Sequence, residues 1–95
     1  LEGAWALSPT YSVSIKKDAV KAIAAFDRTY QRRIAEVLRT LASDPRPRGC
    51  ASLKGIPDTW RVRVGDIRIV YEINDSVLLV HVIRIAHRRD VYREL

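Results

Sequence analysis

The chain has few of the residues that stabilise a small protein by cross-linking or metal binding. Of its 95 residues, only Cys50 is a cysteine, two are histidines and none is a methionine. A single cysteine excludes an internal disulfide, and a zinc site would have to be built from two histidines and carboxylates. We therefore expect no metal and no other cofactor. This composition is typical of a reducing compartment, and we expect the cytoplasm.

Long hydrophobic runs are also absent. No apolar stretch approaches the roughly 18 residues that a membrane-spanning helix needs, and the chain does not open with a basic segment followed by an apolar one. We expect a soluble protein with no membrane partner. Its 95 residues are enough for one domain. We predict that this domain covers residues 11–95, and that residues 1–10 (LEGAWALSPT) are a processed end or an expression remnant.

Acidic residues are in the minority. There are 17 lysines and arginines against 11 aspartates and glutamates, which gives a formal net charge of +6. A small domain with this balance usually binds an anion, such as nucleic acid, membrane headgroups or an acidic protein. The alternative is a basic surface that serves only solubility.

The clearest pattern in the sequence is WRVRVGDIRIVY at residues 60–71. Apolar or aromatic residues alternate with arginines on both sides of a Gly-Asp dipeptide, which is typical of a tight β-hairpin. Successive side chains of a strand point to opposite faces, so one face is apolar. The other, the arginine face, carries Arg61, Arg63 and Arg68. The predicted cross-strand pairs are Val64 with Ile67, Arg63 with Arg68, Val62 with Ile69, and Trp60 with Tyr71.

Folding alone does not require this arginine cluster. Like charges directly across a ladder repel by roughly 0.2–1 kcal/mol per pair. We therefore expect an anion outside the fold to bind the arginines; the alternative is that they only keep one face of the sheet in water. Trp60 and Tyr71 alternate with the arginines, so we expect them in the core rather than stacked on RNA bases.

The segments before the hairpin predict one strand and two helices. Residues 11–15 alternate like a strand. Residues 17–26 and 30–41 have helical spacing with a bend at 27–29, and the prolines within 44–49 end the second helix.

The segments after the hairpin complete an α+β fold. A turn at 74–76 precedes residues 77–85, which are almost wholly apolar, as in a central strand. The predicted order is β-α-α-β-β-β: an antiparallel sheet with two helices packed on one face and the arginine face open. A two-residue turn would place His81 on the arginine face, whereas a three-residue turn would place Arg84 there.

Three segments together resemble the RelE/ParE superfamily of toxins from type II toxin–antitoxin systems. They are LKG at 53–55, WRVRVGDIRIVYEI at 60–73 and VIRIAHRRDVYREL at 82–95, and the likeness extends over residues 11–95. The resemblance implies a small α+β domain whose basic face is covered by a labile, acidic antitoxin. The RelE branch cuts messenger RNA in the ribosomal A site, whereas the ParE branch inhibits DNA gyrase and is not known as a nuclease.

The chemistry favours the RelE branch. In-line attack of a ribose 2′-hydroxyl on the adjacent phosphate needs a base, an acid for the leaving 5′-oxygen, and positive charge for the transition state. Arginine, with a pKa above about 12, cannot serve as the base, but its fork of donors suits phosphate oxygens. Imidazole ordinarily titrates near pH 6.5 and suits proton transfer. The predicted catalytic residues are Arg61, Arg63, Arg68 and Arg88 for the phosphate, with His87 and Tyr92 for proton transfer.

The RelE-type pattern matches three of these positions and differs at two. Arg68 matches the arginine before the Val-Tyr pair, and Arg88 and Tyr92 match the C-terminal arginine and tyrosine. Arg61 and Arg63 stand where lysines are common, so this chain has no lysine there to act as base. The predicted contacts to the RNA backbone are Lys54, Arg61, Arg63, Arg84 and Arg89.

Several of these residues have a structural alternative. His87 would then be a turn residue that caps the last strand, Tyr92 would pack its ring on the core, and His81 would be a satisfied core histidine. The favoured function is a ribosome-dependent mRNA endoribonuclease, an mRNA interferase that inhibits translation, with an acidic antitoxin and A-site message as partners. The alternatives are a gyrase inhibitor with the same fold and no nuclease activity, and a non-toxic basic adaptor.

Overall fold

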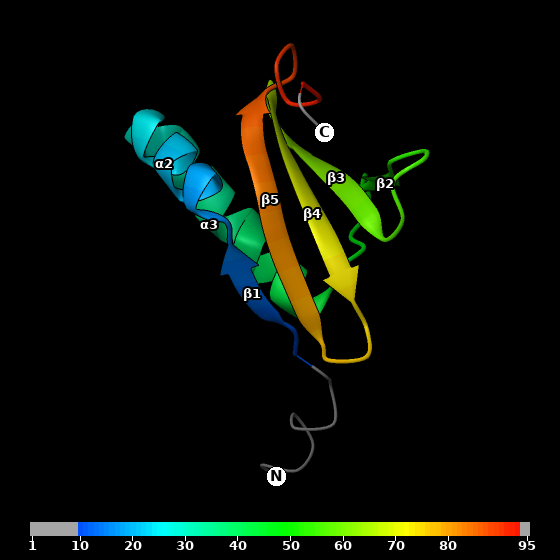
Figure 1. Ribbon diagram of the computed structural model, residues 1–95. Helices are drawn as coiled ribbons and strands as arrows, with labels where there is room; N and C mark the ends of the chain where they lie inside the picture. Colours follow the sequence, from blue (N-terminus) through cyan, green and yellow to red (C-terminus); the bar gives the residue numbers. More distant parts are fainter. Residues whose placement is uncertain (1–9, 94–95) are drawn as a thin grey trace, which may run out of the picture.

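The computed structural model describes residues 10–93. They form two helices and a five-stranded sheet (Figure 1). The elements in chain order are β1 (Ser12–Ile15), α2 (Lys17–Ala25), α3 (Arg28–Ser43), β2 (Ala51–Ser52), β3 (Thr59–Val64), β4 (Ile67–Asn74) and β5 (Leu79–His87). Within residues 10–93, no helix is long and apolar enough to cross a membrane. Apart from Thr10, the segment predicted to be a processed end lies outside the described residues.

The sheet has the strand order β1-β5-β4-β3-β2. Neighbouring strands from β5 to β2 are antiparallel, as predicted for β3, β4 and β5, but β1 runs parallel to β5. Two helices and three strands separate β1 from β5 in the chain, so no tight turn forces these two strands to run in opposite directions. The two-residue strand β2, which pairs with β3, was not predicted because it is too short to show any alternation.

The two predicted helices are present, and the bend between them is where it was expected. Asp27 is the N-cap of α3, and its side chain accepts a hydrogen bond from the backbone N–H of Tyr30 at 2.9 Å. The side-chain amide of Gln31 donates to the carbonyls of Phe26 and Ile23 at 3.0 and 3.2 Å, which satisfies groups at the end of α2. The helix α3 ends at Ser43, just before the first predicted proline stop.

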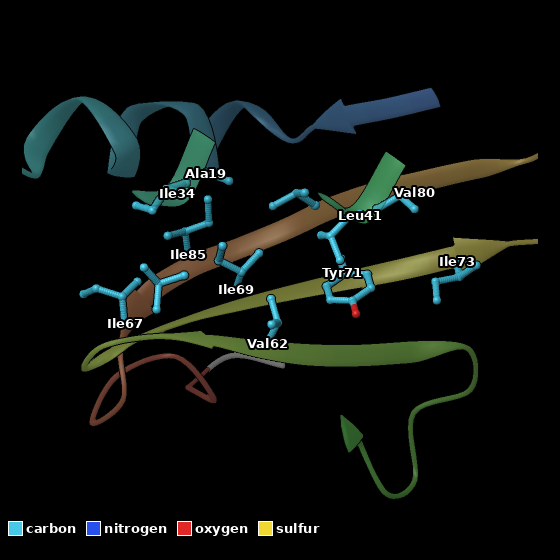
Figure 2. Close-up of a cluster of buried hydrophobic side chains, with 12 residues drawn as sticks. Ala19, Ile34, Leu41, Val62, Ile67, Ile69, Tyr71, Ile73, Val80 and Ile85 are labelled. Atoms are coloured by element: carbon cyan, nitrogen blue, oxygen red, sulfur yellow. The ribbon is translucent and has the colours of Figure 1, made fainter. Parts of the chain in front are cut away.

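The core lies between the helices and one face of the sheet (Figure 2). Ile34 and Leu41 of α3 are fully buried against alternate residues of the strands. Tyr71 is also fully buried, and its hydroxyl donates to the Pro45 carbonyl at 2.7 Å. Trp60 packs against this cluster while partly exposed. The prediction that both aromatic residues belong to the core is confirmed.

All four predicted pairs of the central hairpin are present in the register of β3 and β4. Gly65 and Asp66 form the hairpin loop, and Gly65 has φ = 59°. Positive φ at the first loop position alone is the feature of a type II′ turn, which favours glycine there.

The last strand contains an irregularity that resolves the two alternatives for its register. Val70 pairs with Arg84 and Tyr71 pairs with Val82, so Ile83 is an extra residue, a β-bulge. His81 and Arg84 consequently both lie on the arginine face. This face is not wholly open as predicted, because the C-terminal turn (residues 88–93) packs against one end of it: the Arg84 guanidinium donates to a backbone carbonyl of that turn, that of Asp90.

Candidate nucleic-acid interface

The arginines of the hairpin gather on the face of the sheet that the helices leave uncovered. Arg63 and Arg68 are direct cross-strand partners on β3 and β4. Arg61 stands opposite Val70, and Val70 stands opposite Arg84 on β5. Since cross-strand partners share a face, four arginines occupy two neighbouring rows of the sheet.

Arg61 and Arg68 are held by backbone carbonyls rather than by carboxylates. Arg61 Nη1 donates to the Gly49 carbonyl at 3.1 Å, and Arg68 Nη1 donates to the Gly65 carbonyl at 3.2 Å. Among residues 10–93, no carboxylate oxygen lies within 4.0 Å of the guanidinium nitrogens of Arg61, Arg63 or Arg68. A carbonyl orients a guanidinium without neutralising it, so the full positive charge of these side chains is available to an anion.

Arg88 joins this group through the hairpin loop. Its backbone N–H donates to the Asp66 carbonyl at 2.8 Å, and its Nε lies 4.0 Å from Asp66 Oδ1. The Arg88 side chain is 57% exposed. Arg68 bonds to the carbonyl of Gly65 in the same loop, so Arg68 from β4 and Arg88 from the C-terminal turn converge on the hairpin loop.

Of the two predicted proton-transfer residues, His87 ends β5 and Tyr92 lies in the C-terminal turn. His87 stands opposite Ile67, whose side chain is buried on the helix side, so the register does not place His87 on the arginine face. Its Nδ1 accepts a hydrogen bond from the Arg89 N–H at 3.3 Å, which puts the hydrogen of the neutral ring on Nε2. Tyr92 is 47% exposed, and its neighbour Val91 is fully buried.

The other predicted contacts are more dispersed. Lys54 is exposed in the segment between β2 and β3, and Arg89 is exposed in the C-terminal turn. Arg84 Nη2 donates to the Asp90 carbonyl at 2.9 Å. His81 lies on the arginine face and shares a 2.6 Å hydrogen bond between its Nδ1 and Ser14 Oγ, so it is not a core histidine.

A second polar cluster lies at the other end of the sheet from the hairpin loop, where β4 turns into β5 (Figure 1). Arg46 donates to both carboxylate oxygens of Asp75, and the Tyr11 hydroxyl donates to Oδ1 at 2.6 Å. The Arg46 bond, followed by that of Tyr11, holds the pKa of Asp75 below its ordinary value. The Asp75 bond raises the pKa of Tyr11. This cluster ties together three loops and is not part of the arginine face.

Two features of the site were not predicted. The first is the contact of Asp66 with Arg88, since the sequence pattern predicts only a turn at Asp66. The spacing of these two residues in the sequence does not indicate the contact, because the contact depends on where the C-terminal turn folds. The second is the complete burial of Val70 and of Val91, both outside the core between helices and sheet. The sequence does indicate that Val70 is unusual, since it is the apolar residue on the polar face of the alternating run.

In the described part of the chain, no three His, Cys, Asp or Glu side chains lie close enough to hold a metal ion.

Comparison with families of known proteins gives a match over nearly all of the described residues. The model of the ParE toxin of type II toxin–antitoxin systems, parDE, matches residues 10–92. A comparison with curated protein sequences gave no match.

Solved structures with this fold include several toxin–antitoxin complexes. A chain of the archaeal RelE–RelB complex from Pyrococcus horikoshii is 30% identical with a TM-score of 0.77, over 86% of this chain and 99% of that one. A chain of a RelBE complex from Mycobacterium tuberculosis is 24% identical, with a TM-score of 0.73 and coverage of 85% and 94%. One from the intact E. coli RelBE complex is 23% identical, with a TM-score of 0.72 and coverage of 81% and 95%. With the family match over residues 10–92, these likenesses show that the chain belongs to the RelE/ParE superfamily of type II toxin–antitoxin toxins.

Proposed function

We propose that this toxin is an mRNA endoribonuclease that cuts ribosome-bound message in the cytoplasm and so inhibits translation. The observation that carries the proposal is the convergence of Arg63, Arg68 and Arg88 near one loop, with the charges of Arg63 and Arg68 not neutralised by any described carboxylate. Several guanidinium groups in one place fit a phosphate that gains negative charge in its transition state.

The proposed reaction is an in-line displacement within the RNA. The ribose 2′-oxygen attacks the adjacent phosphorus, the bond from phosphorus to the 5′-oxygen breaks, and the products are a 2′,3′-cyclic phosphate and a 5′-hydroxyl. Arg61, Arg63, Arg68 and Arg88 bind the phosphate oxygens. His87 supplies a proton to the leaving 5′-oxygen as the imidazolium, the form in which both ring nitrogens carry hydrogen and the bond from the Arg89 N–H to Nδ1 is released.

Tyr92 is then the residue left to accept the 2′-hydroxyl proton, which it does as the phenolate, after its own hydroxyl proton has passed to solvent. No lysine stands on the strands of the arginine face. Arginine cannot be the base because its guanidinium does not lose a proton near neutral pH. A site of this kind gains most from a substrate that is already in the reactive conformation, which supports dependence on message ordered by the ribosome.

The proposed partner that switches the toxin off is a cognate acidic antitoxin. Several of the similar solved structures contain an antitoxin bound to its toxin. The net charge of +6 and the exposed arginines of this chain fit an acidic segment laid over the arginine face.

The test is cleavage by two single variants beside a matched control. Arg68→Ala and Arg88→Ala should each remain folded and cut ribosome-bound message about 10²- to 10³-fold more slowly. Arg39→Ala removes one exposed charge from α3 and should cut at the wild-type rate. Wild-type rates in both site variants would show that the nuclease site is misassigned.

A second candidate function is inhibition of DNA gyrase, which is favoured by the match to the ParE toxin model. In that case primer extension on message from cells expressing the toxin shows no new ends, while a supercoiling assay shows inhibited gyrase. The nuclease proposal expects the opposite pair of results. If the toxin neither produces new message ends nor inhibits gyrase, and its expression does not arrest growth, the result would instead favour a basic adaptor without toxicity.

A further inference from the structure

The arginine face carries a buried apolar residue, Val70, in addition to its charges, and the C-terminal turn carries another, Val91. Val70 and Val91 are each 0% exposed, yet neither belongs to the cluster between the helices and the sheet. Val70 lies between Arg61 and Arg84 in its row, so its neighbours on this face are charged. Figure 2 shows the C-terminal turn on the side of the sheet away from the helices, the side to which the pairing of Val70 with Arg61 assigns Val70.

Two hydrogen bonds hold the first half of the C-terminal turn in place. At the start of the turn, the Arg88 N–H donates to the Asp66 carbonyl at 2.8 Å. Further along, Arg84 Nη2 donates to the Asp90 carbonyl at 2.9 Å. The second bond is partly buried. Arg84 belongs to β5, which directly precedes the turn, so this bond holds the turn against the strand from which it emerges.

Burial of the Arg84 side chain is unfavourable in itself, so we expect its hydrogen bond to the Asp90 carbonyl to contribute to the structure of the turn. The β-bulge at Ile83 is what places Arg84 on this face. In the described residues its Nε is buried without a hydrogen-bond partner, and an unpaired buried donor is unfavourable. The side chain that bears this cost makes one hydrogen bond, to the Asp90 carbonyl.

We infer that Arg84 is a positioning residue: it holds the C-terminal turn, through the Asp90 carbonyl, so that Arg88 and Tyr92 stay beside Arg68. The structural part of this inference stands on the contacts above, and only its effect on RNA cleavage rests on the proposed function. Arg84 therefore differs from Arg63, which is exposed and is assigned a direct contact with phosphate.

Amide hydrogen exchange tests the structural part in the free toxin. Arg84→Met keeps most of the apolar stem and removes the donor, whereas Arg39→Met makes the same change at an exposed position of α3. The N–H groups of Val91 and Arg93, which donate to the carbonyls of His87 and Asp90, should exchange about tenfold faster or more in Arg84→Met only. Unchanged exchange at these two amides would overturn the inference.

Cleavage and salt dependence test how Arg84 acts on the reaction. A lost phosphate contact lowers the slope of log K against log salt by about 0.7 for single-stranded RNA. Arg84→Met should keep the wild-type slope and KM while kcat falls about tenfold, because the turn carries a group that acts in the transition state. A reduced slope would show a direct phosphate contact and overturn the assignment. Faster exchange in a toxin whose wild type cuts no RNA would support the positioning role and reject the nuclease proposal.

Discussion

Gly65 of the hairpin loop lies directly against Tyr30 of α3: a Cβ added to Gly65 would stand 2.7 Å from the Tyr30 hydroxyl oxygen. The Tyr30 ring itself packs beside Phe26, with ring centroids 6.2 Å apart, and below the Arg33 guanidinium at 5.3 Å. The loop on which Arg68 and Arg88 converge therefore rests on the helical layer, which links the position of the site to the packing of the core.

Gly65→Ala should destabilise the protein more than the same change at a glycine with open surroundings. A left-handed backbone costs a residue with a Cβ about 1–2 kcal/mol, and at Gly65 the contact with Tyr30 adds to this. Gly55 has φ = 80° with nothing within 4 Å of an added Cβ, so Gly55→Ala measures the backbone cost alone. Urea unfolding of both variants should show the larger loss for Gly65→Ala, and equal losses would contradict the contact.

The alternation of residues 60–71 was sufficient to predict the central hairpin, its register and the arginine face. A period of two together with a two-residue loop leaves only one register in which every apolar residue is buried. The helix bend was predictable for a similar reason, because Asp27 is a good N-cap directly after an apolar helix face.

Contacts that depend on how a distant segment folds onto the hairpin could not be predicted from local sequence patterns. The bulge at Ile83 has no local signal, since residues 77–85 are apolar on both faces and either register buries them equally well. The fold of the C-terminal turn depends on Arg84 and Asp66, which are distant from each other in the chain. The site residues contributed by that turn were therefore predicted by resemblance rather than by pattern.

Tyr71→Phe should cost stability although both residues fill the same volume. The Tyr71 hydroxyl donates to the Pro45 carbonyl at 2.7 Å, and both residues are buried. Removing the hydroxyl leaves a buried acceptor unpaired, which costs about 1–3 kcal/mol. Tyr92→Phe, at an exposed tyrosine, should change the free energy of unfolding by less than about 0.5 kcal/mol. Denaturant unfolding measures both, and equal effects would show that the Pro45 bond contributes nothing.

The cluster of Arg46, Asp75 and Tyr11 should make stability fall in acid. Arg46 first, and then Tyr11, lower the pKa of Asp75 in the folded protein. A carboxyl whose pKa is lowered by folding stabilises the fold at every pH above its unfolded-state pKa, which is about 3.9. This contribution is lost as the pH falls through the folded-state pKa. The difference in stability between the wild type and Asp75→Asn should therefore be constant near pH 7 and narrow below about pH 4. A difference that stays constant from pH 7 to pH 2.5 would contradict this sign.

Asp66→Asn should strengthen the binding of RNA while leaving the fold nearly unchanged. The Asp66 carboxylate is 63% exposed and lies 4.0 Å from Arg88, so the pair contributes at most about 1 kcal/mol to stability. The Asp66 carbonyl, which accepts from the Arg88 N–H, remains in the variant. The change thus removes one negative charge beside the arginine face without removing the anchor of the C-terminal turn.

The expected gain in affinity is electrostatic, so it should depend on salt. Since screening extends over about 30 Å at 0.01 M salt and about 10 Å at 0.1 M, Asp66→Asn should bind single-stranded RNA several-fold more tightly at low salt and less so at high salt. Glu36→Gln removes the same charge from the exposed side of α3 and should gain less, because it does not neighbour the bound phosphate. Equal gains for the two variants would mean that RNA responds only to net charge, and the convergence of Arg68 and Arg88 would then not be where the phosphate binds.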